Sequence, residues 1–84
     1  MMPTVDILGY PLQVKRVSDL PMVKRHLALT CVWMAKHASD DDPGMVLRWM
    51  VPVVWLTTDL EMEDAEQLPV GALAKIVEAA VGEN

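Results

Sequence analysis

The stretch RWMVPVVWLTTDLEMED, residues 48–64, places an apolar run with two tryptophans directly before a block of carboxylates. The two halves favour opposite surroundings. Moving apolar side chains out of water lowers the free energy, whereas moving carboxylates out of water raises it. The apolar half must therefore be covered, either by the rest of the chain or by another molecule.

The chain is too short to cover much apolar surface by itself. A domain of this size buries only about 60 to 65% of the surface that its unfolded chain exposes. Yet 52% of the 84 residues are apolar, and contiguous apolar surface that stays exposed usually marks an interaction site. We expect a single domain over residues 1–84 that binds another protein, associates with itself, or does both.

Charge is divided unevenly along the chain. Residues 1–38 hold five basic and two acidic residues, a net charge of +3, whereas residues 39–84 hold two basic and ten acidic residues, a net charge of −8. The acidic balance argues against direct nucleic-acid binding, which needs a basic face. It suits a head-to-tail contact or a basic partner, and equally a solvated surface that keeps an apolar protein soluble.

Neither the cysteine content nor the hydropathy indicates export or a membrane. Cys31 is the single cysteine, so no intramolecular disulfide can form. The first ten residues lack the basic and apolar segments of a signal peptide, and the apolar run over 45–56 is shorter than the about 20 residues that span a bilayer. We expect a cytoplasmic protein with no membrane partner.

The pattern of apolar residues predicts an α+β fold, in which a short N-terminal β-hairpin precedes a bundle of three to four helices. Apolar and polar residues alternate on both sides of Gly9-Tyr10-Pro11. This alternation around a turn predicts strands near 4–8 and 12–17, in a hairpin that covers 4–17. The helical part is expected to cover 19–82.

The first predicted helix is capped by Ser18 or Asp19 and runs to about His37. Between residues 27 and 35 only Thr30 is polar, so its middle is expected to be enclosed on more than one side. Steps of three and four residues predict a core stripe of Leu20, Val23, Leu27, Cys31 and Met34.

A second helix is expected from Pro43 and over 45–56, with a proline in its middle. Pro52 removes a backbone donor and crowds the preceding turn, so we expect a kink or a break there. A competing interpretation takes VPVVWLTT, residues 51–58, as a strand, because valine and threonine favour strands.

The last third predicts two more helices. LEMEDAEQL, residues 60–68, is expected to form a short acidic helix, and Pro69 opens a final one that stops near Gly82. The apolar face of the final helix is predicted to contain Leu73, Ile76, Val77 and Ala80.

No group of residues indicates catalysis, a metal or a cofactor. His26 and His37 are about 16 Å apart along one helix, too far to share a metal. Cys31 lies in an apolar segment where a thiol is inert, and the glycines are scattered singly, so no phosphate-binding loop is present. We expect a non-catalytic protein that needs no cofactor.

The candidate contact surface follows from the tryptophans. Trp49 and Trp55 are six residues apart, so on one helix they point about 120° apart and cannot both enter a narrow core stripe. Tryptophan is enriched at interface hot spots. We assign the partner-binding surface to Arg48, Trp49, Val53, Trp55, Leu56, Leu73, Ile76 and Val77. An acidic surface is predicted at Asp40, Asp41, Asp42, Glu61, Glu63, Asp64 and Glu66.

Residues 56–82, LTTDLEMEDAEQLPVGALAKIVEAAVG, resemble the C-terminal segment of small tail assembly chaperones of long-tailed bacteriophages. In that family an apolar helix leads to a short helix with an E-D-x-x-x-L pattern, held here by Glu63, Asp64 and Leu68. A final helix with L-x-x-I/V spacing follows, held here by Leu73, Ile76 and Val77. Members also often begin with a short strand pair that leads into a helix.

The resemblance implies a function as well as a fold. Such a protein works in the cytoplasm of the bacterial host and is not an enzyme. It binds apolar or coiled-coil-forming segments of the tape measure protein, or another tail protein, and keeps them soluble during tail assembly.

Two other functions fit the same residues. One is a small acidic phage-encoded inhibitor or adaptor, whose carboxylates imitate phosphates and block a basic nucleic-acid-binding surface of a host complex. The other is a structural subunit of a particle, which would form homo-oligomers through the edge of the hairpin.

Overall fold

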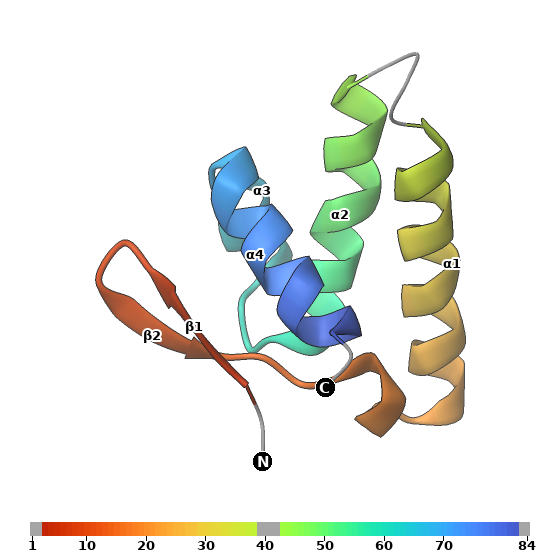
Figure 1. The fold of residues 1–84 in the computed structure, drawn as a ribbon, viewed down its shortest axis with the longest axis horizontal. Coiled ribbons are helices and arrows are strands. Elements are labelled where there is room, and N and C mark those ends of the chain that lie inside the picture. The colour runs from red at the N-terminus through yellow and green to blue at the C-terminus, as the bar shows by residue number, and fades with distance from the viewer. Residues whose placement is uncertain (1–2, 39–42, 83–84) are drawn as a thin grey trace.

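A computed structural model describes residues 3–38 and 43–82 of the chain. Within these residues, the strands β1 (Thr4–Ile7) and β2 (Tyr10–Gln13) form an antiparallel hairpin, followed by a 3-10 turn, η1 (Val17–Asp19), and four helices (Figure 1). The predicted α+β class, a hairpin followed by helices, is confirmed. The helices are α1 (Met22–Ala38), α2 (Pro43–Thr57), α3 (Met62–Glu66) and α4 (Val70–Val81).

The hairpin turns at Leu8-Gly9, so the predicted turn over residues 9–11 is wrong by one to two residues. The second strand is Tyr10–Gln13 and not 12–17, because the earlier turn moves the start of this strand toward the N-terminus. Leu8 and Gly9 have positive φ, 52° and 89°, as in the type I′ turns that connect most two-residue hairpins. Pro11 belongs to β2 and lies opposite Asp6. The pair next to a two-residue turn is hydrogen-bonded, so the following Asp6–Pro11 pair is not, and the missing N–H of Pro11 faces outward.

The first helix begins later than predicted, because residues 17–19 form the 3-10 turn instead. The Pro21 carbonyl accepts a hydrogen bond from Arg25 N at 2.8 Å, which starts α1. The Arg25 guanidinium also donates to the Leu20 carbonyl, with Nη2 at 3.2 Å. Neither Ser18 nor Asp19 therefore caps α1.

The side of α1 that enters the core differs from the prediction. Val23 and Leu27 of the predicted stripe are 72% and 50% exposed. Trp33 and Leu29 are exposed too, so the middle of the helix is covered on one side only. α1 packs chiefly against α2, and short side chains at such a contact let two helices approach closely. The buried residues of α1 are Ala28, Cys31, Val32 and Ala35.

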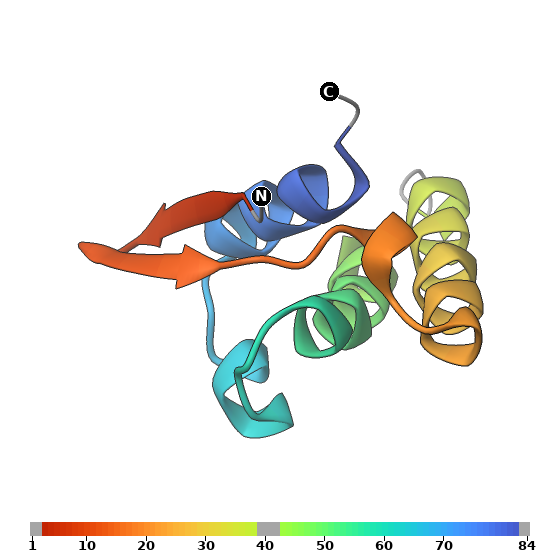
Figure 2. The same cartoon turned by 90° about the horizontal axis from the view of Figure 1, so that it is seen from below.

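The central helix is α2, which contacts α1, α3 and α4 (Figures 1 and 2). It is helical from Pro43 to Thr57 with Pro52 inside. Of the predicted kink or break at Pro52, the break is therefore wrong, and so is the alternative strand over 51–58. At the C-terminal end of α2 the Thr57 hydroxyl donates to a helix carbonyl, that of Val53, at 2.7 Å.

The C-terminal elements agree with the prediction. The acidic helix is α3, and α4 begins directly after Pro69, whose carbonyl accepts hydrogen bonds from Ala72 N at 3.0 Å and Leu73 N at 3.1 Å. α4 ends at Val81 with Gly82 as its C-cap. The apolar face of the final helix is confirmed, since Leu73, Ile76 and Ala80 are buried.

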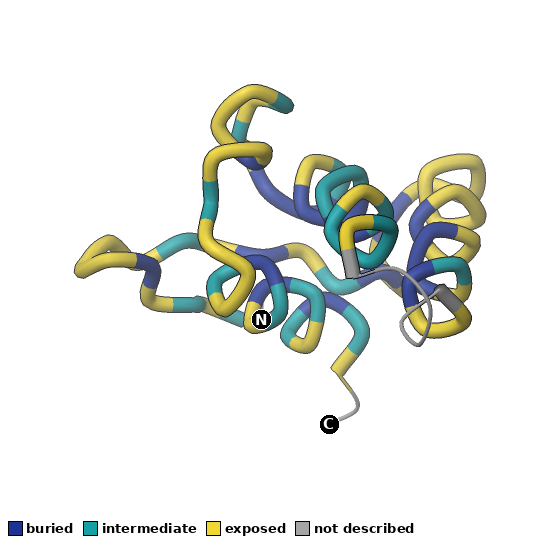
Figure 3. Tube along the Cα trace, turned by 90° about the horizontal axis from the view of Figure 1, so that it is seen from above, coloured by how far each residue is buried: buried dark blue, intermediate teal, exposed yellow. Residues whose placement is uncertain are grey.

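The hydrophobic core contains buried residues from β1, η1 and each of α1–α4. Buried residues follow the inward sides of these elements (Figure 3). β1 packs against α4, and Lys15 N donates to the Thr57 carbonyl at 2.7 Å, which ties the exit of the hairpin to the end of α2. A hairpin alone is marginal in water, and this one is held by the helices.

Candidate interaction surfaces

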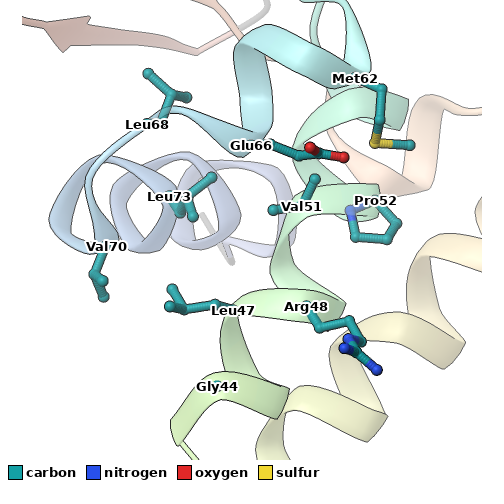
Figure 4. A pocket seen from close by; sticks show the side chains of 10 residues that line it. All are labelled: Gly44, Leu47, Arg48, Val51, Pro52, Met62, Glu66, Leu68, Val70 and Leu73. Atoms are coloured by element: carbon teal, nitrogen blue, oxygen red, sulfur yellow. The ribbon is translucent and has the colours of Figure 1, made fainter.

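A groove opens between α2, α3 and α4 (Figure 4). It has a volume of about 480 Å³, and all its lining residues are apolar except Gly44, Arg48 and Glu66. We call it the α2/α3/α4 groove. Its lining residues are Gly44, Leu47, Arg48, Val51, Pro52, Met62, Glu66, Leu68, Val70 and Leu73.

The floor of the groove consists of apolar residues that helical spacing places on one side of α2. Leu47 and Val51 are four residues apart on α2 and therefore share one side of that helix. Leu73 enters from α4 towards Val51 (Figure 4). Met62 of α3 closes one end with a flexible side chain that adapts to different partners. The floor of the groove is therefore apolar, and its shape can adjust to a partner.

The charged residues of the groove lie at its margins. Arg48 of α2 and Glu66 of α3 are both exposed. The acidic side continues in Glu61, Glu63 and Asp64, which are exposed as well. Small-molecule sites usually add a few polar groups that converge on the ligand. This groove has none on its floor, so it suits apolar side chains of a macromolecule better.

A second exposed apolar surface lies on the side of α1 that faces away from α2. We call it the outer face of α1, and it consists of Met22, Val23, Arg25, His26, Leu29, Trp33 and His37, all exposed. Trp33 is 57% exposed, and its ring packs against that of His37 with centroids 4.0 Å apart. The face combines apolar and basic side chains, and α1 contains no acidic residue.

A smaller hollow of about 390 Å³ lies between α1, α2 and α4. It is mostly apolar, with Lys36 and Glu78 as its charged lining residues. Val77, one of the predicted contact residues, lines this hollow and not the α2/α3/α4 groove.

The structure separates the predicted partner-binding residues. Val53, Leu73 and Ile76 are buried, so these three hold the core together and offer a partner little or no surface as the chain is folded. Leu73 also lines the groove, although it is almost fully buried. Arg48 is the member of the predicted set that is exposed at the groove margin.

The two tryptophans of α2 lie in different surroundings, as their angular separation predicts. Trp49 is partly buried against the core. Its Nε1 is buried with no hydrogen-bond acceptor among the described residues, which costs about 1–3 kcal/mol. Trp55 is 45% exposed and lies with Leu56 beside Lys24 and Asp59.

The acidic surface is described in part. Asp40, Asp41 and Asp42 lie outside the described residues, while Glu61, Glu63, Asp64 and Glu66 are exposed on and just before α3. The outer face of α1 is the surface that the sequence analysis missed. Its signal was present, because Leu29 and Trp33 form a second apolar stripe on the opposite side of the helix from the predicted one.

The remaining candidates for chemistry among the described residues are the Cys31 thiol and the possible metal ligands. Burial raises the pKa of the Cys31 thiol, which makes the reactive thiolate scarcer. Among residues 3–38 and 43–82, no cluster of three or more His, Cys, Asp or Glu side chains could hold a metal ion. None of the described helices is both long enough and apolar enough to cross a bilayer.

Comparison of the chain with protein-family models, with curated proteins and with solved structures finds no match.

Proposed function

We propose that this protein is a non-catalytic interaction module that binds an apolar helical segment of another protein in the α2/α3/α4 groove. The observation that carries the proposal is the groove itself, an open apolar bed with its charged residues at the margins. An amphipathic helix places its apolar residues at steps of three and four, which is the usual way to fill a groove between helices.

The contact residues in the groove suit a helix. Leu47 and Val51 are one turn apart on α2, so a client helix can set side chains of its own between them, as ridges enter grooves in helix packing. Val70 is 56% exposed at the edge of the groove. A client that covers Val70 removes further apolar surface from water, which stabilises the complex by about 25 cal/mol for each Å² covered.

We further propose that the client is a segment of a phage tail protein, the tape measure protein in particular. This specific client is supported by the resemblance of residues 56–82 to tail assembly chaperones. α3 and α4 belong to that segment and supply one side of the groove. A protein that covers a coiled-coil-forming segment needs an apolar bed and a soluble exterior, and the exposed carboxylates of α3 supply the latter.

The test is a binding titration with a fluorescent peptide of leucine heptads, the class of segment that the proposed client presents. Val70→Glu places a charge at the exposed edge of the groove, and we expect it to weaken binding at least about tenfold, since burying an unpaired charge costs more than 1.4 kcal/mol. Val23→Glu is the matched control, because Val23 is also exposed but lies outside the groove. Equal peptide affinity of Val70→Glu and the unmodified chain would refute the groove as the binding site.

The acidic inhibitor remains a second candidate because of one observation. Glu61, Glu63, Asp64 and Glu66 are all exposed within six residues. Reversing the charges of Glu61, Glu63 and Asp64, which are not among the lining residues of the groove, should abolish an inhibitor that imitates phosphates and leave binding of an apolar peptide nearly intact. Val70→Glu should have the opposite effect, so the two variants separate the two functions.

A further inference from the structure

The two sides of the α2/α3/α4 groove carry opposite charges. On the α2 side the charged lining residue is Arg48, and on the α3 side it is Glu66 (Figure 4). Both side chains are exposed, and within the described part of the chain neither forms an ion pair or a side-chain hydrogen bond. We call these two sides the basic wall and the acidic wall of the groove.

The two charges line one groove without neutralising each other. In Figure 4 the side chains of Val51 and Pro52 lie between Arg48 and Glu66. A helix that covers the apolar floor therefore sets one of its flanks against each wall. Opposite charges across such a contact attract, and like charges oppose binding and exclude wrong partners.

We infer that the groove selects an amphipathic helix with one acidic and one basic flank, and that this charge pattern fixes the direction in which the helix lies. The inference rests on the proposed function and specifies the client further. In a heptad repeat the two flanks are the e and g positions, which border the apolar stripe. An acidic flank against Arg48 and a basic flank against Glu66 give attraction at both walls.

The direction follows from the geometry of a helix in a groove. A helix that is turned end over end keeps its apolar stripe on Leu47 and Val51, but each flank then faces the other wall. A helix with equal flanks meets the same charges in either direction. A helix with opposite flanks has two attractive contacts in one direction and two repulsive contacts in the other, so only the first is favoured.

The groove has the length of about one heptad. Its α2 lining runs from Gly44 to Pro52, which is about 12 Å of helix at 1.5 Å per residue. One copy of the protein therefore contacts about one e and one g position of a client. A peptide made of identical heptads presents the same two flanks in every register, which makes it a suitable probe.

The experiment is a titration of four fluorescent leucine-heptad peptides with the unmodified chain. Each peptide is kept at nanomolar concentration so that it does not pair with itself. The flanks are glutamate and lysine, glutamate on both sides, lysine on both sides, or glutamine on both sides. We expect the mixed peptide to bind at least about threefold more tightly than the all-glutamate and all-lysine peptides, because one flank of each of those faces a like charge. High salt should remove the difference, since it screens exposed charges.

Reversing the charge of one wall should change which peptide binds most tightly. Arg48→Glu makes both walls acidic and should favour the all-lysine peptide, whereas Glu66→Lys makes both walls basic and should favour the all-glutamate peptide. Lys24→Glu and Glu78→Lys change the net charge by the same amounts, at exposed residues that do not line the groove. These two control variants should still prefer the mixed peptide.

A photoreactive group at the N-terminus of the peptide reports the direction of binding. The mixed peptide and the peptide with its two flanks exchanged should crosslink near opposite ends of the groove, one around Gly44 and the other around Pro52. The double variant Arg48→Glu with Glu66→Lys should exchange the two crosslinking sites. Mass spectrometry of the digested product locates each site.

The outcomes separate this inference from the proposed function. Equal affinity of the unmodified chain for the four peptides, or one crosslinking site for both mixed peptides, would overturn the inference and leave the groove as the binding site. A preference of the unmodified chain for the all-lysine peptide would also overturn it, because the net charge of −5 would then decide. Failure of all four peptides to bind, the glutamine peptide included, would refute the proposed function and the inference together.

Discussion

At the scale of single residues, the turn of the hairpin is the least expected feature. Leu8 has φ of 52° and is 79% exposed, so a bulky apolar residue occupies a left-handed position without any packing in return. That conformation is uncommon for residues other than glycine, asparagine and aspartate. Asn-Gly is the preferred pair for this turn type.

We predict that Leu8→Asn raises the free energy of unfolding by about 0.5–1 kcal/mol, because asparagine tolerates positive φ better than leucine does. Urea denaturation followed by circular dichroism measures the change. Gly9→Ala is the matched opposite, since Gly9 has φ of 89° and an added Cβ strains the backbone although the surrounding space is open. A stabilising Gly9→Ala would show that the chain turns elsewhere.

Cys31 gives a second prediction at this scale. Burial raises the pKa of its thiol, so we expect it to react with a thiol reagent much more slowly in the folded chain than in urea at the same neutral pH. The unfolded chain also loses this proton first as the pH rises, so the free energy of unfolding should fall once the pH passes the ordinary pKa of a thiol. Equal labelling rates in the two states would contradict the burial of Cys31.

The sequence predicts the burial or the helix-boundary role of single residues well where the residue type alone determines it. Cys31 is buried, and Pro69 and Gly82 bound the last helix. It fails at Pro11, because a proline usually marks a turn and only the register of the hairpin shows that its missing N–H faces outward.

At the scale of elements, α1 shows why helical periodicity alone misleads. The helix has apolar residues nearly all round, so spacing predicts more than one possible core face. Leu20 and Cys31 of the stripe that we predicted are buried, but Val23 and Leu27 are exposed, and Ala28 and Ala35 are buried in their place. The contact with α2 selects small side chains, and that contact is not visible in the local sequence.

We predict that Leu27→Ala changes the free energy of unfolding by less than about 1 kcal/mol, since Leu27 is half exposed. Ala28→Leu should cost about 1–3 kcal/mol, because Ala28 is fully buried and the larger side chain overpacks the contact with α2. Both are measured by chemical denaturation. The reverse order would mean that α1 is rotated so that the predicted stripe faces the core.

The candidate site could be predicted only in part, because local sequence does not show how the helices pack. Of the eight assigned contact residues, Arg48 and Leu73 line the α2/α3/α4 groove. Which residues line it depends on how α4 crosses α2. Val53 and Ile76 turn inward, and Leu47, Val51 and Val70 form the groove instead.

At the scale of the whole molecule, one core joins nearly every element. Ile76 is fully buried in a cluster that also contains Ile7 of the hairpin and Val54 of α2. We predict that Ile76→Ala costs about 2–5 kcal/mol, the usual range for isoleucine truncated in a core. Tryptophan fluorescence and far-ultraviolet circular dichroism should shift to a lower midpoint together. Two separated transitions would show that α1 and α2, which hold the tryptophans, unfold independently of the other helices.

The bond from Lys15 N to the Thr57 carbonyl and the packing of β1 on α4 also bear on how the chain folds as it is made. The hairpin leaves the ribosome before the helices do, and its partners lie more than forty residues later in the sequence. Such distant contacts slow folding, because a long loop must close before they form. During synthesis the N-terminal strands therefore wait for α4, and their apolar side stays open to chaperones and proteases of the cell until residues 70–81 arrive.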